Sequence, residues 1–249
     1  SLQQAVKTAS TRRSDGMADE IAETLLERDV WTTPADDLAL YGPALGQMTV
    51  EACLDGLRAA WRPAHRLVMV TGNAKLPGEG TAPTAIKGAY EKSSAMAVAA
   101  PVALEEAKWA YTTFGAPGRI TKREHVPDLD VTLLTFENGV RLNFKKTDFE
   151  ANRVRVSVRV GTGQLTEPRD QPGLATYAGQ AFTEGGLGRH SADDLRRILA
   201  GRTVGVGFSA GGDAFTLGGA TNREDLVLQL QLAAARISER QRVSCSPSE

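Results

Sequence analysis

The sequence has few of the side chains that metal sites and redox centres use. It contains two cysteines and three histidines among 249 residues. Cys53 and Cys245 form neither a C-x-x-C pair nor the framework of a disulfide-stabilised domain. No two histidines lie close enough in sequence to bind one metal from the same helical face. A disulfide framework and a local histidine-rich metal site are therefore excluded.

The chain also lacks a large net charge of either sign and long apolar runs. Its 29 basic and 30 acidic residues give a net charge of -1, so no field of one sign attracts nucleic acid or an anionic membrane. No apolar run approaches the roughly 20 residues that span a bilayer. Residues 1–30 lack the succession of basic, apolar and small residues that forms a secretory signal. Ser1 is not a natural start, so a signal peptide on a longer parent chain is still an open alternative. We expect no nucleic-acid partner and no membrane span.

The composition is that of a globular protein, and its first part, residues 1–75, is predicted to be helical with one strand at its end. Met17, Ile21 and Leu25 recur at helical spacing and indicate a helix with one buried stripe that ends near Arg28. Thr33-Pro34 starts a second helix. Thr49 caps a third, which stops before Pro63 and has its apolar stripe at Cys53, Leu54, Leu57 and Trp61. Residues 67–70 (LVMV) then predict a short buried strand.

Residues 76–125 are predicted to be a linker with a connecting helix. Prolines and glycines crowd residues 74–83, which favours an exposed connection. The spacing of small and apolar residues predicts a helix over 86–97 and a further turn or two over 104–111. Residues 114–118 (FGAPG) end this segment.

Over residues 126–238 the sequence pattern is first that of strands and then that of a mixture of helices and strands. Glu137-Asn138-Gly139 separates two strands, 131–136 and 140–145, and Asn-Gly suits a tight hairpin turn. Valine alternates with polar residues over 153–160, as in a strand with one buried face. These three strands are predicted to form one sheet.

After Pro172 the pattern becomes helical again. We expect a helix over 174–182, a helix from Ser191 to Gly201, a strand over 204–208 with its partner at 215–217, and a last helix capped by Asn222. This order predicts an α+β domain with helices packed on one face of a largely antiparallel or mixed sheet. Residues 239–249 form a polar tail.

Several residues are candidates for a metal site or a catalytic site, but a purely structural role is favoured for each of them. His190 and Asp193 stand one turn apart and suit two ligands of a metal, but a histidine beside a helix cap needs no metal. His65 and His125 are expected to be solvated. Neither Ser209 nor Ser244 lies in a G-x-S-x-G elbow.

Two glycine-rich segments are also weak candidates. Gly161 and Gly163 follow a strand, but Thr166 replaces the third glycine of a dinucleotide-binding motif, so a chain reversal is favoured. Residues 185–191 precede a helix and suit an anion, yet the G-K-[ST] of a phosphate-binding loop is absent. We therefore predict no cofactor-binding residue.

One long segment resembles a known family. Residues 136–175 (FENGVRLNFKKTDFEANRVRVSVRVGTGQLTEPRDQPGLA) are similar to the entry of pitrilysin-type (insulinase-like) peptidase domains. There a hairpin, a valine-rich strand and a glycine-rich turn lead to a helix with the zinc motif H-x-x-E-H. Residues 48–72 and 109–118 (WAYTTFGAPG) resemble the end of a preceding domain and a connector of a bacterial branch.

The resemblance implies that the zinc motif is lost here. Gly173-Leu174-Ala175 matches the start of the family's helix, and the motif's three chemical positions fall on Thr176, Gly179 and Gln180. Threonine is a poor zinc ligand, and neither glycine nor glutamine can act as a base. We therefore assign no catalytic and no metal-binding residue, and no cofactor to this segment.

The family also implies a role for a segment without zinc. Its members are often built from four related domains, with zinc in the first and silent copies completing a closed chamber; residues 126–238 look like the third copy, without its second half. The expected partners are the catalytic half of the same protein or a partner peptidase subunit, which would hold the zinc, and a peptide substrate. The resemblance suggests a bacterial, periplasmic protein. The alternative is a structural or protein-interaction module related to peptidase-like core subunits. The parent protein resembles a zinc metalloendopeptidase, whereas this chain alone is predicted to be inactive.

Overall fold

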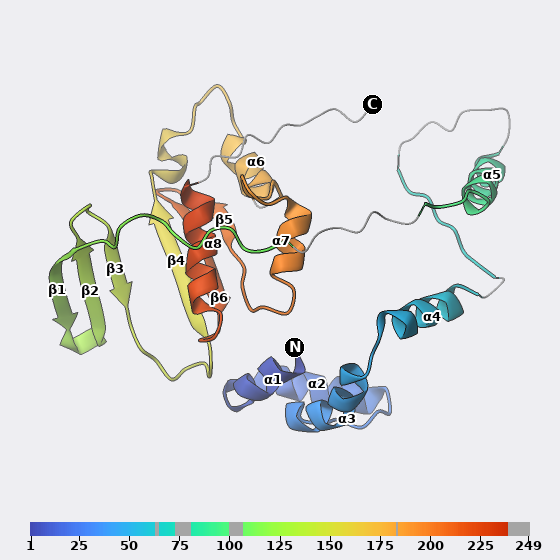
Figure 1. Cartoon of the computed structure of the whole chain (residues 1–249). Coiled ribbons are helices and arrows are strands. Elements are labelled where there is room, and N and C mark those ends of the chain that lie inside the picture. The colour runs from blue at the N-terminus through green and yellow to red at the C-terminus, as the bar shows by residue number, and fades with distance from the viewer. Residues whose placement is uncertain (63–64, 73–80, 100–106, 183, 239–249) are drawn as a thin grey trace. The chain divides into compact units, whose positions relative to one another are not determined.

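The computed structural model describes residues 1–62, 65–72, 81–99, 107–182 and 184–238. The chain divides into two compact units, one of Ser1–Leu40 with Glu106–Glu249 and the other of Tyr41–Glu105. The described residues form eight α-helices and two antiparallel three-stranded sheets (Figure 1). The α+β class predicted from the sequence is confirmed. The units do not follow the predicted boundaries, and the assignment of residues 1–75, 76–125 and 126–238 to parts of a longer protein stays a prediction.

The chain begins with helices α1 (Leu2–Thr8), α2 (Ser14–Leu26) and α3 (Pro34–Gly46), with a 3₁₀ turn, Ala9–Thr11, after α1. Thr33 caps α3 as predicted, because its hydroxyl accepts a hydrogen bond from the Asp36 N–H at 3.2 Å. The helix α1 was not predicted. No residue of these helices is buried, so the predicted buried stripe on α2 is wrong: Leu25, for example, is 65% exposed.

The unit Tyr41–Glu105 contains α4 (Val50–Trp61) and α5 (Ala82–Ser94). The Thr49 hydroxyl accepts a hydrogen bond from the Ala52 N–H at 3.1 Å and caps α4 as predicted. The guanidinium of Arg66 lies 5.0 Å from the ring centre of Trp61 and donates a hydrogen bond to the Tyr90 hydroxyl. The predicted strand at 67–70 is wrong. These residues are irregular and exposed, because the described part of this unit offers no strand with which they can pair.

The first sheet has the order β1-β2-β3, from β1 (Ile120–Val126), β2 (Val131–Phe136) and β3 (Arg141–Phe144). The predicted hairpin is confirmed: Gly139 has φ +84°, and the Phe136 N–H donates to the Val140 carbonyl at 2.8 Å. The strand β1 was not predicted, because its sequence, ITKREHV, is polar on both faces and shows no alternation.

The second sheet has the order β4-β6-β5, from β4 (Val154–Val160), β5 (Gly207–Ala210) and β6 (Phe215–Thr221). The predicted sheet of residues 131–136, 140–145 and 154–160 is therefore wrong: the hairpin pairs with β1, and β4 pairs with β6, from Val154 opposite Thr221 to Val160 opposite Phe215. The predicted pairing of 204–208 with 215–217 is confirmed, although β5 begins only at Gly207.

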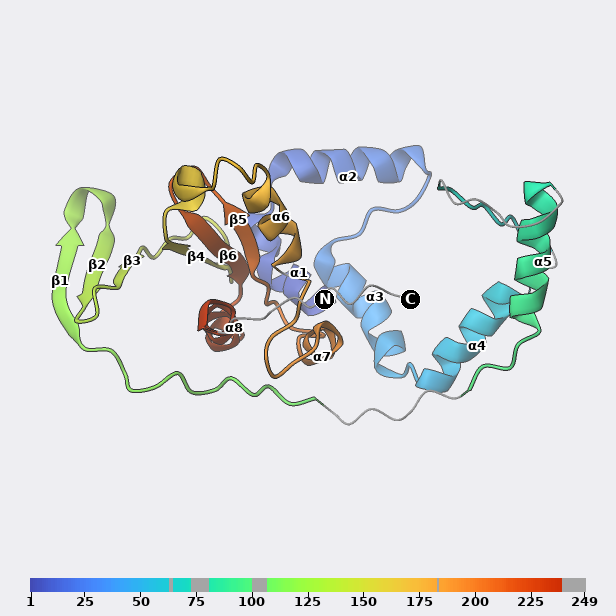
Figure 2. The same ribbon diagram turned by 90° about the horizontal axis from the view of Figure 1, so that it is seen from above.

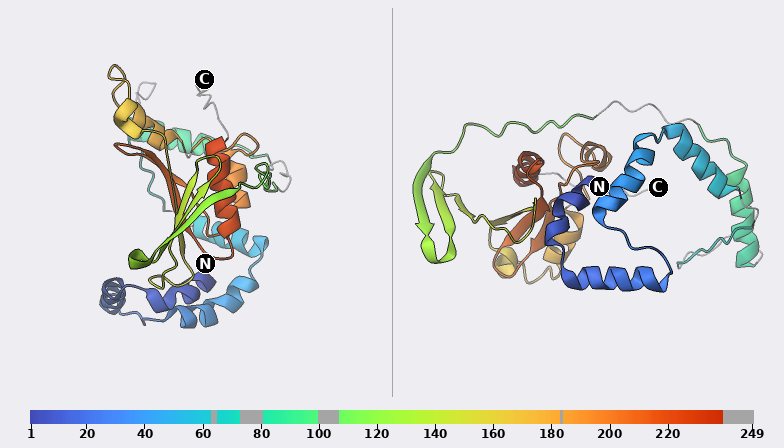
Figure 3. Two further views of the ribbon diagram at one scale, coloured as in Figure 1. Left: turned by 90° about the vertical axis from the view of Figure 1, so that its left-hand side faces the viewer. Right: turned by 90° about the horizontal axis from the view of Figure 1, so that it is seen from below.

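The core lies where α7 (Ala192–Ile198) and α8 (Leu226–Ser238) meet the segment before β1. Helix α8 packs on β4 and β6, as three views show (Figures 1, 2 and 3). The buried apolar cluster consists of Tyr111, Leu187, Leu195, Leu232 and Ala235. The predicted helical turns over 104–111 are wrong for residues 107–111, which are irregular, while 104–106 lie outside the described residues.

Candidate functional site

Helix α6 (Leu174–Ala181), on which the resemblance places the three positions of the zinc motif, lies beside β5. Gly173 precedes it with φ +92°, a left-handed conformation that favours glycine. The carboxylate of Glu167 accepts a hydrogen bond from the Ala175 N–H at 2.9 Å. This contact satisfies one of the free amides at the start of the helix and places a negative charge at its positive end. The sequence therefore forms the predicted helix with a fixed N-terminus.

The three chemical positions of the motif lie on the accessible side of α6. Thr176 and Gln180 are exposed, and Gly179 is half-buried. A Cβ atom built on Gly179 would meet nothing within 4 Å, so no crowding requires a glycine there. A hydroxyl and a neutral amide one turn apart are not a zinc ligand pair, and glycine offers no base. The side chains present do not fit zinc, and no cluster of three or more His, Cys, Asp or Glu side chains suited to a metal occurs among the described residues.

The opposite side of α6 packs on the second sheet. Ala175 is buried, and the ring of Phe182, just after the helix, stacks on Phe208 of β5 with 4.3 Å between ring centres. Leu174 is 46% exposed, so its predicted place in the packing face is wrong. The buried side of the helix starts one residue later, at Ala175.

The end of α6 is bound by a cation from α8. Arg236 donates hydrogen bonds to the Phe182 carbonyl at 3.2 Å and to the Gly186 carbonyl at 2.6 Å. Burial lowers the pKa of the Arg236 guanidinium from its usual value. A cation at this place is favourable, because the carbonyl groups at the end of a helix carry partial negative charge. Arg236 thus joins the end of α6 to α8.

His190 has a structural role. Its Nε2 atom accepts a hydrogen bond from the Ala110 N–H at 3.1 Å, and its ring stacks on Trp109 with 5.5 Å between ring centres. The residue is only 6% exposed. The Asp193 carboxylate is exposed and pairs with Arg196 instead. The interpretation of His190 and Asp193 as a metal pair is therefore overturned, and that of a structural histidine beside a helix cap holds.

The loop of residues 185–191 uses its amides within the protein. The Leu187 and His190 backbones exchange hydrogen bonds of 2.7 and 3.0 Å, and the Arg189 N–H donates to the Tyr111 hydroxyl at 2.8 Å. The Ser191 N–H donates to the Asp194 carboxylate at 3.0 Å. These amides are not available to a phosphate, which contradicts the nucleotide-binding interpretation of this loop.

Among the described residues, the remaining candidates lie in exposed segments, in a turn and in a strand. His65 and His125 are exposed, as expected, and His125 lies 3.7 Å from the Asp130 carboxylate. Gly163 reverses the chain with φ +56°, and a Cβ atom there would lie 2.2 Å from the Gly211 carbonyl oxygen. Ser209 lies in β5, whereas Ser244 falls outside the described residues.

The sequence did not reveal how the segment WAY, residues 109–111, is held. The Trp109 Nε1–H donates to the Tyr111 carbonyl at 2.9 Å and to the Gln231 Oε1 at 3.0 Å. Tyr111 is 6% exposed in the core. Two large aromatic residues separated by one position inside a predicted linker were the available signal, since such residues are seldom left in water.

Comparisons with known proteins support the fold. No protein-family model matches the sequence, and no curated relative matches it. The periplasmic protease PqqL from Escherichia coli has a similar structure, with a TM-score of 0.50 and 20% sequence identity over 96% of this chain and 26% of that chain. A variant of the ferredoxin protease FusC in complex with Arabidopsis ferredoxin matches with a TM-score of 0.45 and 18% identity, over 93% of this chain and 26% of that one. The chain thus spans about a quarter of the length of each protease. No helix in the described ranges is long and apolar enough to cross a membrane.

Proposed function

We propose that this chain is a non-catalytic segment of a bacterial zinc metallopeptidase of the pitrilysin type. Its role is to help form the chamber of the full protein and to bind peptide there. Two observations of different kinds support the proposal: the resemblance of residues 136–175 to the family, and the structural similarity to part of PqqL. The periplasmic location in the description of PqqL supports a periplasmic address.

The observation that carries the non-catalytic role is the chemistry of α6. The helix keeps its capped start and its contact with β5, but Thr176, Gly179 and Gln180 stand where the zinc ligands and the base would be required. Hydrolysis of a peptide bond by a zinc enzyme needs a metal-bound water and a general base. The catalytic partner, which is the other half of the same protein or a separate subunit, would supply both.

The test uses the purified chain. We expect less than stoichiometric zinc after dialysis against a zinc-containing buffer, and no hydrolysis of an unfolded peptide above the buffer control. Stoichiometric zinc together with chelator-sensitive cleavage would disprove the non-catalytic role.

The second candidate is a structural or protein-interaction module with the same fold. It is favoured by the many exposed apolar residues of α4, such as Leu57 at 61% and Trp61 at 64% exposure, because a surface of this kind suits packing against another chain. The sequence upstream in the same reading frame, or in an adjacent gene, separates the two candidates. An H-x-x-E-H motif there supports the peptidase segment, and its absence supports the module.

A further inference from the structure

A basic groove lies between β3 and the turn before α8. Its volume is about 970 Å³, and it is lined by the connection from β3 to β4, the start of β4, and residues 223 and 224. Five cations line it against two carboxylates: Lys145, Lys146, Arg153, Arg155 and Arg223 face Glu150 and Glu224. The groove therefore has a local excess of positive charge in a chain whose net charge is only -1.

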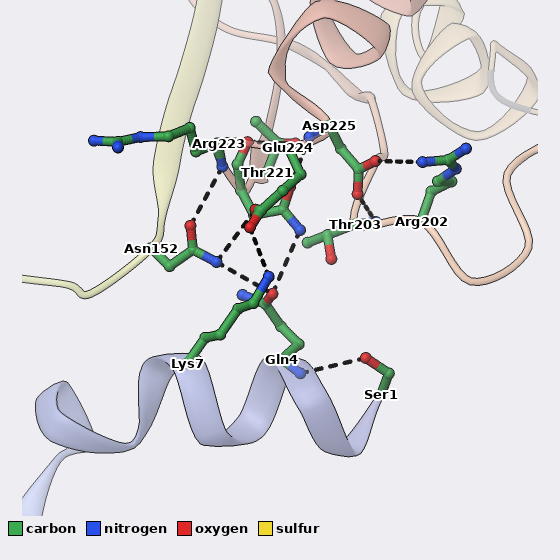
Figure 4. Close-up of polar contacts among 11 residues, drawn as sticks. Ser1, Gln4, Lys7, Asn152, Arg202, Thr203, Thr221, Arg223, Glu224 and Asp225 are labelled. Atoms are coloured by element: carbon green, nitrogen blue, oxygen red, sulfur yellow. Dashed lines mark hydrogen bonds and ion pairs between the residues drawn. The ribbon is translucent and has the colours of Figure 1, made fainter. Parts of the chain in front are cut away.

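Both carboxylates of the groove are already paired. Glu150 accepts two hydrogen bonds from Arg155, both of 2.8 Å, and lies 3.4 Å from Arg153. The Arg155 hydrogen bonds lower the pKa of the Glu150 carboxyl. Glu224 accepts a hydrogen bond of 2.6 Å from Lys7 of α1, which lowers its pKa, and a weaker one of 3.4 Å from Asn152 (Figure 4).

Three cations remain without an ion pair among the described residues: Lys145, Lys146 and Arg223. Figure 4 shows the Arg223 side chain extending away from Glu224, and only the Arg223 main-chain N–H is engaged, with the Asn152 side-chain oxygen at 3.5 Å. Phe149, in the same lining, is 75% exposed. Unpaired cations beside an exposed aromatic ring form a surface for a ligand that combines carboxylates with apolar atoms.

We propose that this groove binds an acidic, extended segment of polypeptide. Three unpaired cations suit a few carboxylates, whereas a protein that binds nucleic acid typically contacts about six to ten phosphates. The inference rests on the proposed function, in which the segment binds a peptide. The groove adds the chemical class of that peptide.

The experiment measures fluorescence anisotropy of a short labelled peptide in which glutamate alternates with valine, titrated with the whole chain. We expect binding at low salt that is lost at about 1 M salt, where the screening length falls to about 3 Å. The variant Lys145→Glu with Lys146→Glu should weaken binding about ten-fold, on the scale of two or three lost exposed charge pairs. The matched control reverses two adjacent cations outside the groove, Lys122→Glu with Arg123→Glu on β1, and should leave the affinity unchanged.

A second variant changes the affinity in the opposite direction. Glu150→Gln removes a negative charge from the groove and releases Arg155, so it should strengthen binding by about two- to five-fold. The matched control is Glu137→Gln, because Glu137 is likewise held by an arginine, Arg119, through hydrogen bonds of 3.1 and 2.6 Å, but lies in the hairpin of the first sheet.

Three outcomes would overturn the inference: no binding by the folded wild-type chain, equal binding of the same peptide with lysine in place of glutamate, or tighter binding of a single-stranded oligonucleotide. Circular dichroism establishes that each variant is folded. The zinc and hydrolysis assays of the proposed function are independent of these titrations, so failure of one proposal is distinguishable from failure of the other.

Discussion

The side-chain amide of Gln229 pairs with both backbone polar groups of Gly205. The Gly205 N–H donates to Gln229 Oε1 at 2.9 Å, and Gln229 Nε2 donates to the Gly205 carbonyl at 2.8 Å. Gln229 is 0% exposed in the first turn of α8. The glutamine thus takes the place of a neighbouring strand for Gly205. This explains why β5 begins at Gly207 instead of at the predicted residue 204.

Replacing this glutamine should destabilise the unit strongly. Gln229→Leu removes the two hydrogen bonds to the Gly205 main chain, and a typical hydrogen bond contributes about 0.5–1.5 kcal/mol. We expect the free energy of unfolding to fall by about 2 kcal/mol in a urea titration followed by circular dichroism. The control is Val227→Leu on the same helix, because Val227 is 67% exposed. Equal stability of the wild type and Gln229→Leu would show that the pairing contributes nothing.

Tyr111 supports a smaller prediction about the segment before β1. Tyr111→Phe keeps the ring in the core but removes the hydroxyl that accepts the Arg189 N–H. The free energy of unfolding should decrease by about 1 kcal/mol, the usual contribution of one hydrogen bond. Tyr177→Phe is the matched control, since Tyr177 is 58% exposed on α6. If both substitutions have the same small effect, the Tyr111 hydroxyl does not anchor the loop.

Local signals predicted the elements of this fold better than their partners. Ser191 and Asn138-Gly139 act through atoms a few residues away, so the helix start and the hairpin turn were read correctly from the sequence. The partner of β4 is β6, which lies more than fifty residues later in the chain, since Val160 pairs with Phe215. The repeating valines of β4 predict a strand but carry no information about which strand lies beside it.

The candidate site shows the same limit. The residue types at 176, 179 and 180 suffice to argue that α6 cannot hold zinc, because ligand chemistry is a property of the side chains themselves. The role of His190 depends on Ala110 and Trp109, which lie about eighty residues earlier and contact it only in the folded chain. The basic groove likewise combines residues 145–155 with Arg223, and no sequence pattern joins them.

The capping box of α7 makes stability depend on pH in acid. Asp194 accepts hydrogen bonds from the Ser191 hydroxyl at 2.8 Å and the Ser191 N–H at 3.0 Å, which lower the pKa of its carboxyl below the ordinary value of 3.8. A lowered pKa in the folded state means that the stabilisation is fully present above pH 3.8 and is lost as the pH falls through the lower, folded value.

Asp194→Asn should therefore flatten the dependence of the unfolding free energy on pH below 3.8. The measurement is a series of urea titrations at acid pH values, compared with the wild type. Asp193→Asn is the neighbouring control, because the Asp193 carboxylate pairs with Arg196 and caps no backbone amide in the described structure. An unchanged slope in Asp194→Asn would show that the capping box does not contribute to the acid sensitivity.

Introducing the side chains of the H-x-x-E-H motif into α6 separates metal binding from catalysis. In the triple variant Thr176→His, Gly179→Glu and Gln180→His, two imidazoles lie one turn apart on an accessible face, and the space around Gly179 admits a side chain. The variant should bind zinc more tightly than the wild type in a competition assay with a chromogenic chelator, because two histidines at this spacing can share one metal.

The same variant should still fail to hydrolyse an unfolded peptide. A catalytic zinc site uses three protein ligands and an open position for water; the substitutions supply two imidazoles, and no ready-made cluster of metal-binding side chains occurs in the described residues. The variant with Thr176→Ala in place of Thr176→His keeps one imidazole and should lose the gain in zinc affinity. Efficient, chelator-sensitive hydrolysis by the triple variant would mean that the three substitutions alone had silenced this domain; zinc binding without hydrolysis would mean that the rest of the catalytic site is missing as well.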